Sequence, residues 1–274
     1  MQRTSSDQRR GHQAGAGPWP LVLAVLLLCA SAQQAAAVTI DATDRGWYGD
    51  DGTHNTSILN YLAGDCDGGT CVAGSNTGID EFRNFFVFDL SGVTGPITAA
   101  TLILHNTDGT TQFPNNVGFF SDTGSETYLV SEVSTAIASL LAGTGGMAAF
   151  GDLGSGTSYA SFTATAAANG TFVEIALNSA AIAALNQASG LFAFGGSITT
   201  LNGFPDEETL FAFSDSGLLS DTQLELTVVP EPSTALLLAA AIALLGALRT
   251  RRTPVPLTVR ARSAAQRRAS SSRP

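Results

Sequence analysis

The sequence predicts an all-β protein: an antiparallel β-sandwich, jelly-roll-like, with two short helices. Short apolar or alternating runs separated by Gly, Asn, Asp and Thr fill the central part of the chain, which is typical of antiparallel strands joined by turns. Helix-like patterns are few. Residues 38–229 number 229 − 37 = 192, and a chain of that length forms one core that buries about 70% of its unfolded surface.

Nine runs are predicted as strands, at 38–42, 84–90, 100–105, 126–133, 158–165, 171–177, 191–198, 209–214 and 222–229. Runs 171–177 and 222–229 alternate between apolar and polar residues, so each should bury one face. Runs 84–90 and 191–198 are more continuously apolar, as expected for central strands. Helices are predicted near 134–143 and 178–188, the second with Asn178 or Ser179 as its N-cap.

Residues 1–37 have the order of a signal peptide. Arg3, Arg9 and Arg10 precede the apolar run LVLAVLLLCA, and small residues follow, which favours export and removal of the leader by a signal peptidase. The apolar run is too short to anchor the chain, because a stable span needs about 20 residues. Cleavage after Ala37 is the first expectation and cleavage after Ala32 the second.

Residues 230–252 have the order of a C-terminal membrane signal. Pro230, Glu231 and Pro232 form an extended spacer, because proline disfavours helix in itself and in the residue before it. The apolar stretch 233–248 follows, then a stop-transfer cluster of Arg249, Arg251 and Arg252. Sixteen helical residues span about 24 Å, enough for a short transmembrane helix with snorkelling arginines. Positive charge keeps that end in the cytoplasm, so the body lies outside.

This trio of Pro-Glu-Pro, short span and arginine cluster resembles the PEP-CTERM sorting signal of Gram-negative bacteria that make exopolysaccharide. The resemblance implies export through the Sec machinery, an inner-membrane intermediate, and recognition by exosortase, a transpeptidase-like enzyme that removes the membrane segment. Pro230, Glu231 and Pro232 are then recognition residues of a substrate. The chain continues beyond the arginines through 253–274, a basic, Ser- and Pro-rich tail that is predicted to be disordered.

Two blocks of the body also resemble a recurrent group of PEP-CTERM proteins. They are FRNFFVFDLSGVTGPITAATLIL at 82–104 and VEIALNSAAIAALNQASGLFAFGG at 173–196. The first block is similar as well to strands of carbohydrate-binding jelly rolls. Both blocks are strand, helix and turn patterns, so the resemblance implies a fold and no chemistry.

Charge is divided unevenly along the chain. All thirteen basic residues are arginines, and the body holds two of them, Arg45 and Arg83, against 21 carboxylates between Asp41 and Glu225, so its net charge is 2 − 21 = −19. This charge argues against nucleic acid as a partner. Arg83 is expected to pair with Glu81 or Asp89.

Cys66 and Cys71 would be the two cysteines left after removal of the leader, which contains Cys29. In an oxidising compartment they are expected to form a disulfide that closes a short Gly-rich loop. Metal binding by the pair is the lesser alternative, because no further Cys or nearby His completes a zinc site.

The segment 41–80 is the richest candidate for a ligand site. Clustered carboxylates on turns can supply the oxygen ligands of a structural calcium ion; the candidates here are Asp41, Asp44, Asp50, Asp51, Asp65 and Asp67. Their spacing does not match an EF-hand, so solvated loop carboxylates are the competing interpretation. Trp47 and Tyr48, flanked by glycines, are considered as an exposed platform that stacks a sugar ring, against packing over a sandwich end.

Catalytic patterns are scarce. The body has two histidines, His54 and His105, and no G-x-S-x-G or H-E-x-x-H motif. Asp50 and Asp51 could serve a glycosidase only if they faced one cleft, and neighbouring strand residues point apart. The sequence therefore favours a non-enzymatic surface or matrix protein associated with exopolysaccharide or biofilm, without a cofactor. A calcium-stabilised carbohydrate-binding module is the first alternative and a secreted hydrolase the second.

Overall fold

The computed structural model describes residues 34–65, 81–108, 118–202, 207–211 and 218–230, together with Leu238, Ala241, Ile242, Leu245 and Gly246. The chain divides into two compact units, one of Gln33–Glu231 and one of Met1–Ala32 with Pro232–Pro274. We call the first unit the β domain. Cys66, Asp67, Cys71, Glu231, Pro232, Arg249, Arg251, Arg252 and the tail lie outside the described residues, and the expectations for them stay predictions.

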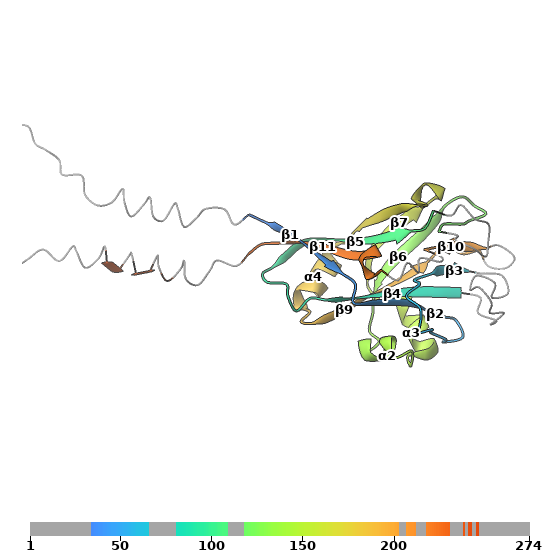
Figure 1. Ribbon diagram of the computed structural model, residues 1–274, viewed down its shortest axis with the longest axis horizontal. Helices are drawn as coiled ribbons and strands as arrows, with labels where there is room; N and C mark the ends of the chain where they lie inside the picture. The colour runs from blue at the N-terminus through green and yellow to red at the C-terminus, as the bar shows by residue number, and fades with distance from the viewer. Residues whose placement is uncertain are drawn as a thin grey trace, which may run out of the picture. The chain divides into compact units, whose positions relative to one another are not determined.

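The β domain is a sandwich of two antiparallel sheets (Figure 1). The smaller sheet has the order β1-β11-β5-β8, and its strands are β1 (Ala36–Asp41), β11 (Thr222–Val228), β5 (Ile97–Asn106) and β8 (Thr171–Ala176). The larger sheet has the order β10-β3-β4-β9-β6-β7, with β2 also paired to β4. Its strands are β2 (Asp44–Gly49), β3 (Ala63–Asp65), β4 (Glu81–Asp89), β6 (Glu126–Glu132), β7 (Ser158–Ala164), β9 (Leu191–Ile198) and β10 (Glu208–Leu210).

The sandwich prediction is confirmed, and all nine predicted strand runs overlap observed strands. Two strands of the described residues were missed, β2 and β3. Their sequences, DRGWYG and AGD, are rich in Gly and Asp, which are depleted in strands. Pairing with β4 makes them strands all the same. Of run 209–214, Thr209 and Leu210 belong to β10, which ends at Leu210, and residues 212–214 lie outside the described residues.

Helices lie outside the two sheets. The predicted helices appear as α2 (Ile137–Leu141) and α4 (Ser179–Gln187), and α3 (Gly146–Leu153) was missed in a Gly-rich run. Asn178 is the N-cap of α4, as expected: its side-chain oxygen accepts hydrogen bonds from the amides of Ala180 and Ala181. Among the described residues no helix is both long and apolar enough to cross a membrane.

The position of β4 between two packed layers explains why its sequence is apolar throughout. Phe86 and Phe88 belong to the main core between the two sheets. Phe85 and Val87 face the other way and pack in a second cluster with residues of β2, β9, α2 and α3. A strand covered on both faces needs apolar side chains on both, which is why NFFVF does not alternate.

One buried polar side chain joins the two sheets, and another joins strands of the larger sheet to the loop before β3. The guanidinium of Arg45, on β2, donates from Nη1 to the hydroxyl of Thr222 on β11 at 2.9 Å, and its Cζ lies 4.6 Å from the ring centroid of Tyr61. On the inner face of β4, the Asn84 amide donates to the carbonyl of Tyr61 at 2.8 Å. Its oxygen accepts a 2.6 Å hydrogen bond from the hydroxyl of Tyr128.

Replacing Tyr128 by Phe should lower the free energy of unfolding by about 1–3 kcal/mol, because it leaves the buried Asn84 oxygen without its donor. Thermal or urea denaturation of the full chain measures this change. Tyr159→Phe is the matched control, since the Tyr159 hydroxyl makes no hydrogen bond within the described part of the chain. Equal stability of the two variants would contradict the assigned role of the Tyr128 hydroxyl.

Candidate functional site

The last strand of the β domain leads directly into the predicted sorting motif. Strand β11 ends at Val228, and the amide of Val229 still donates to the carbonyl of Pro96 at 2.9 Å. Gly95 has a φ of +96°, and a side chain there would collide with the carbonyl oxygen of Val229. Pro230 follows, exposed and without an amide hydrogen to continue the ladder. Pro-Glu-Pro therefore starts directly after Val229, the last residue in the described part of the β domain whose amide bonds to a neighbouring segment.

Strand β1 lies beside this exit. It pairs with β11 over six residues, from Ala36 opposite Val228 to Asp41 opposite Gln223. The start of β1 and the end of β11 thus share one end of one ladder, so both chain ends leave the β domain at neighbouring positions (Figure 1).

The apolar segment after the motif is described at five residues, all of them helical and exposed. Leu238, Ile242 and Leu245 are each more than 60% exposed. Four and three residues separate them, which is the spacing of one face of a helix. This agrees locally with the predicted helix.

Of the two interpretations of Trp47 and Tyr48, the exposed sugar-stacking platform is wrong, and the structure shows both rings packed inside the fold. Trp47 is 3% exposed and Tyr48 is fully buried. Trp47 packs edge-on against Phe82, with ring centroids 4.9 Å apart. The Tyr48 hydroxyl donates to the carbonyls of Ser139 and Leu140 at 3.0 and 2.9 Å, and burial raises its pKa. Because β2 is a paired strand under α2 and α3, the Tyr48 ring holds these helices to the sheet, while Trp47 packs against Phe82 of β4.

The acidic segment does not gather into a metal site among its described residues. Asp41 accepts a hydrogen bond from Gln223, Asp44 from the amide of Arg45, and Asp51 from Thr53. No group of three or more His, Cys, Asp or Glu in the described ranges could hold a metal ion. Asp41, Asp44, Asp50, Asp51 and Asp65 therefore do not form the predicted calcium site by themselves.

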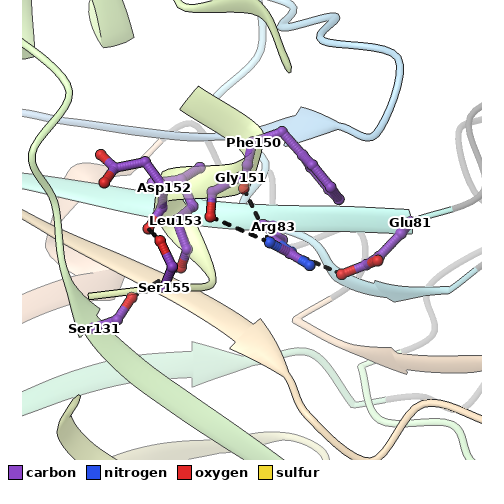
Figure 2. A network of polar contacts seen from close by, with 8 residues as sticks. All are labelled: Glu81, Arg83, Ser131, Phe150, Gly151, Asp152, Leu153 and Ser155. Atoms are coloured by element: carbon purple, nitrogen blue, oxygen red, sulfur yellow. Dashed lines mark hydrogen bonds and ion pairs between the residues drawn. The ribbon is translucent and has the colours of Figure 1, made fainter. Parts of the chain in front are cut away.

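Arg83 has a structural role (Figure 2). Its Nε lies 2.7 Å from a carboxylate oxygen of Glu81, which confirms that expected pair. Its Nη1 donates to the carbonyls of Phe150 and Gly151 at 3.2 and 3.4 Å, and its Cζ lies 4.2 Å from the centroid of the Phe150 ring. A cation at the last carbonyls of a helix stabilises that end.

Two serines anchor the end of the same helix. The hydroxyl of Ser131, on β6, donates to the carbonyl of Leu153 at 2.9 Å, and that of Ser155 donates to the carbonyl of Asp152 at 3.3 Å (Figure 2). Ser131 and Arg83 thereby fix α3 to the outer face of the larger sheet, while the Ser155 hydrogen bond is local to the end of the helix.

The histidines are likewise accounted for by packing. His54 Nδ1 lies 2.7 Å from the carbonyl oxygen of Trp47, and its ring stacks on Tyr48 with centroids 4.9 Å apart. The ring of His105 contacts Phe172, with centroids 5.0 Å apart. Within the described residues neither imidazole forms a hydrogen bond with a serine, cysteine or carboxylate side chain, so they show no nucleophile and base pair.

A groove beside α4 was not found from the sequence. Its volume is about 340 Å³, near the lower end of the range for small-molecule sites. Residues of β6, β7, β9, α4 and the start of α2 line it: Glu132, Val133, Ile137, Tyr159, Ala184, Gln187, Ala188, Leu191, Phe192 and Ala193. We call it the α4 groove. Its residues come from four separate runs of the chain, so no sequence motif marks it.

The α4 groove combines aromatic rings with hydrogen-bonding groups. The rings of Tyr159 and Phe192 stack with centroids 6.4 Å apart and an interplanar angle of 28°. A carboxylate oxygen of Glu132 accepts a 2.7 Å hydrogen bond from the hydroxyl of Thr157, which orients it. Burial, and then the charge of Glu132, raises the pKa of Tyr159, so its hydroxyl stays a neutral donor. Leu191, at the rim, is 46% exposed.

Comparison with known protein families identifies the C-terminal motif. Residues 228–252 match the family model of the PEP-CTERM protein-sorting motif, so the predicted recognition of this motif is confirmed. The match begins at Val228, the last residue of β11. No curated protein matches the chain.

The β domain should lose stability as the pH falls from about 6.5. Burial, which outweighs the hydrogen bond to Trp47 and the charge of Asp44, lowers the pKa of His54 in the folded state. Above the ordinary pKa of about 6.5 the imidazole is neutral in both states. Below it the unfolded chain takes up the proton first, so stability declines until the pH reaches the folded-state pKa.

Urea denaturation of the wild type and of His54→Asn between pH 7.5 and pH 5 measures this contribution. The asparagine amide can donate to the Trp47 carbonyl and does not titrate. The difference in free energy of unfolding between the two proteins should shrink or reverse as the pH falls, because only the wild type loses stability through protonation of His54. Parallel pH curves would exclude His54 as the cause.

Proposed function

We propose that this chain, which carries a PEP-CTERM protein-sorting motif at residues 228–252, is an exported substrate of an exosortase. In this proposal the chain is delivered by the Sec machinery, held in the inner membrane by its C-terminal segment, and then processed to the cell surface or the extracellular matrix. The observation that carries the proposal is the position of Pro230 within the matched segment: it is exposed and directly follows Val229, whose amide still bonds to the body of the β domain.

The proposed role at the surface is non-enzymatic association with exopolysaccharide or biofilm, and it requires no cofactor. Its support lies in the side chains that could have suggested catalysis: within the described residues, His54, His105 and Arg83 each serve packing or helix attachment. The net charge of −19 in the body opposes direct binding of a polyanion. We therefore expect a neutral polysaccharide as the partner.

Mapping the mature C-terminus tests the sorting step. Intact and peptide mass spectrometry of the protein from envelope and medium of the native host should show an end close to Pro230 and no peptides from 235–274. Replacing Pro230, Glu231 and Pro232 by alanine should leave the whole C-terminal segment in the membrane fraction, because the enzyme loses its recognition residues.

A strain without exosortase is the control and should show the same unprocessed form for the wild-type chain. An intact C-terminus of the wild type in a host with active exosortase would contradict the proposal and indicate a simple membrane-anchored protein.

The α4 groove favours a second candidate function, a carbohydrate-binding module. Sugar rings stack their C–H faces on aromatic rings, and their hydroxyls bond to carboxylates and amides. Phe192, which is half-buried, supplies a ring, and Glu132 and Gln187 supply hydrogen-bonding groups around one concave surface. The predicted sugar-stacking pair Trp47 and Tyr48 is buried, so the groove replaces it in this alternative.

Titration with oligosaccharide fragments of the host's neutral exopolysaccharide tests the second candidate. Gln187→Ala should weaken binding about 5- to 10-fold, the loss expected for one hydrogen bond of about 1–1.4 kcal/mol. Gln223→Ala, on the opposite sheet, is the matched control and should bind as the wild type. Absence of binding by the wild type, or equal loss in both variants, would remove the groove as a sugar site.

A further inference from the structure

The N-terminal processing site is left open by the sequence, which offers two positions with small residues at the required spacing. Ala30-Ser31-Ala32 permits cleavage before Gln33, and Ala35-Ala36-Ala37 permits cleavage before Val38. The sequence order alone favours the second position, which lies farther from the apolar run.

The β domain uses residues that the second cut would remove. Strand β1 begins at Ala36, and Ala36 and Ala37 pair with Val228 and Thr227. Cleavage before Val38 would delete two of the six residue pairs of the β1–β11 ladder. It would also place the new charged amine of Val38 at the end of the sheet, opposite Leu226. The compact unit as a whole begins at Gln33.

The two pairs that this cut would remove, Ala36 with Val228 and Ala37 with Thr227, lie at the end of β11 next to Pro-Glu-Pro. On the other side of β11, the ladder with β5 shifts its register between Thr227 and Val228. At these two residues the regular antiparallel partner is therefore β1. Because β1 side chains are mostly exposed, its contribution there is backbone pairing, which depends on the residues being present and not on their identity.

We infer that signal peptidase cleaves this chain after Ala32, so that the mature protein starts at Gln33 and keeps β1 whole beside the sorting motif. The inference rests on the proposed export. The position of the N-terminal cut then decides whether the end of β11 is paired on both sides. With β1 complete, β11 is flanked by strands on both sides up to Val228. The corresponding expectation from the sequence, cleavage after Ala37, is replaced by the second one.

The experiment is N-terminal peptide mapping by mass spectrometry of the full-length chain expressed in its native host, with two matched variants. Ala32→Leu and Ala37→Leu each put a large side chain at the position before one of the candidate bonds, where signal peptidases require a small one. Ala37 is exposed on β1, so its replacement does not disturb the core.

The expected result is a start at Gln33 for the wild type and for Ala37→Leu, and complete loss of that start in Ala32→Leu. A wild-type start at Val38 that Ala37→Leu abolishes would overturn the inference and leave the proposed export intact. An uncleaved N-terminus of the wild type would overturn both, because the leader would then not be a signal peptide.

Discussion

The architecture depends on the burial of β4 on both faces. Its aromatic residues alternate between the core of the sandwich and a second cluster on the outside of the larger sheet. The outer cluster exists because α2 and α3 cover that face, and the hydrogen bonds nearby attach these two helices to the sheet. Tyr48 donates to the carbonyls of α2, and Arg83 donates to those of α3. Residues that might have formed a binding surface are thereby committed to packing.

Polar groups inside the sandwich limit what the strands can contain. The Asn84 and Tyr128 side chains lie against β9 at Gly196, where a side chain would collide with both. Gly196 is therefore required by the neighbouring hydrogen bond, because buried polar groups must be paired, whereas Gly195 makes room for the Leu153 backbone on the other face of β9. The apolar and polar parts of the core fix each other.

The smaller sheet connects the fold to the sorting signal. β11 lies between β1 and β5 and ends at Val228, where the matched motif begins. The two ends of the folded chain are thus adjacent, and the ladder that joins them lies at the base of the motif. Pro230, the first residue of Pro-Glu-Pro, is exposed and follows β11 after one residue.

The sequence by itself determined the C-terminal sorting motif, the sandwich class, both long apolar strands and the cap of α4. These follow from local order: charges and apolar runs in a fixed sequence, alternation along a strand, and a cap residue next to its helix.

The sequence could not determine the strands β2 and β3, the burial of Trp47 and Tyr48, or the α4 groove. Each of these depends on which distant segments meet. A Gly- and Asp-rich run becomes a strand only because β4 offers it a partner. Tyr48 becomes core only because helices from about 90 residues farther along the chain cover it, and Trp47 is buried against Phe82 of the strand that pairs with β2. Tertiary structure decided these points because burial and hydrogen-bond satisfaction are properties of the assembled layers, and no window of the sequence contains them.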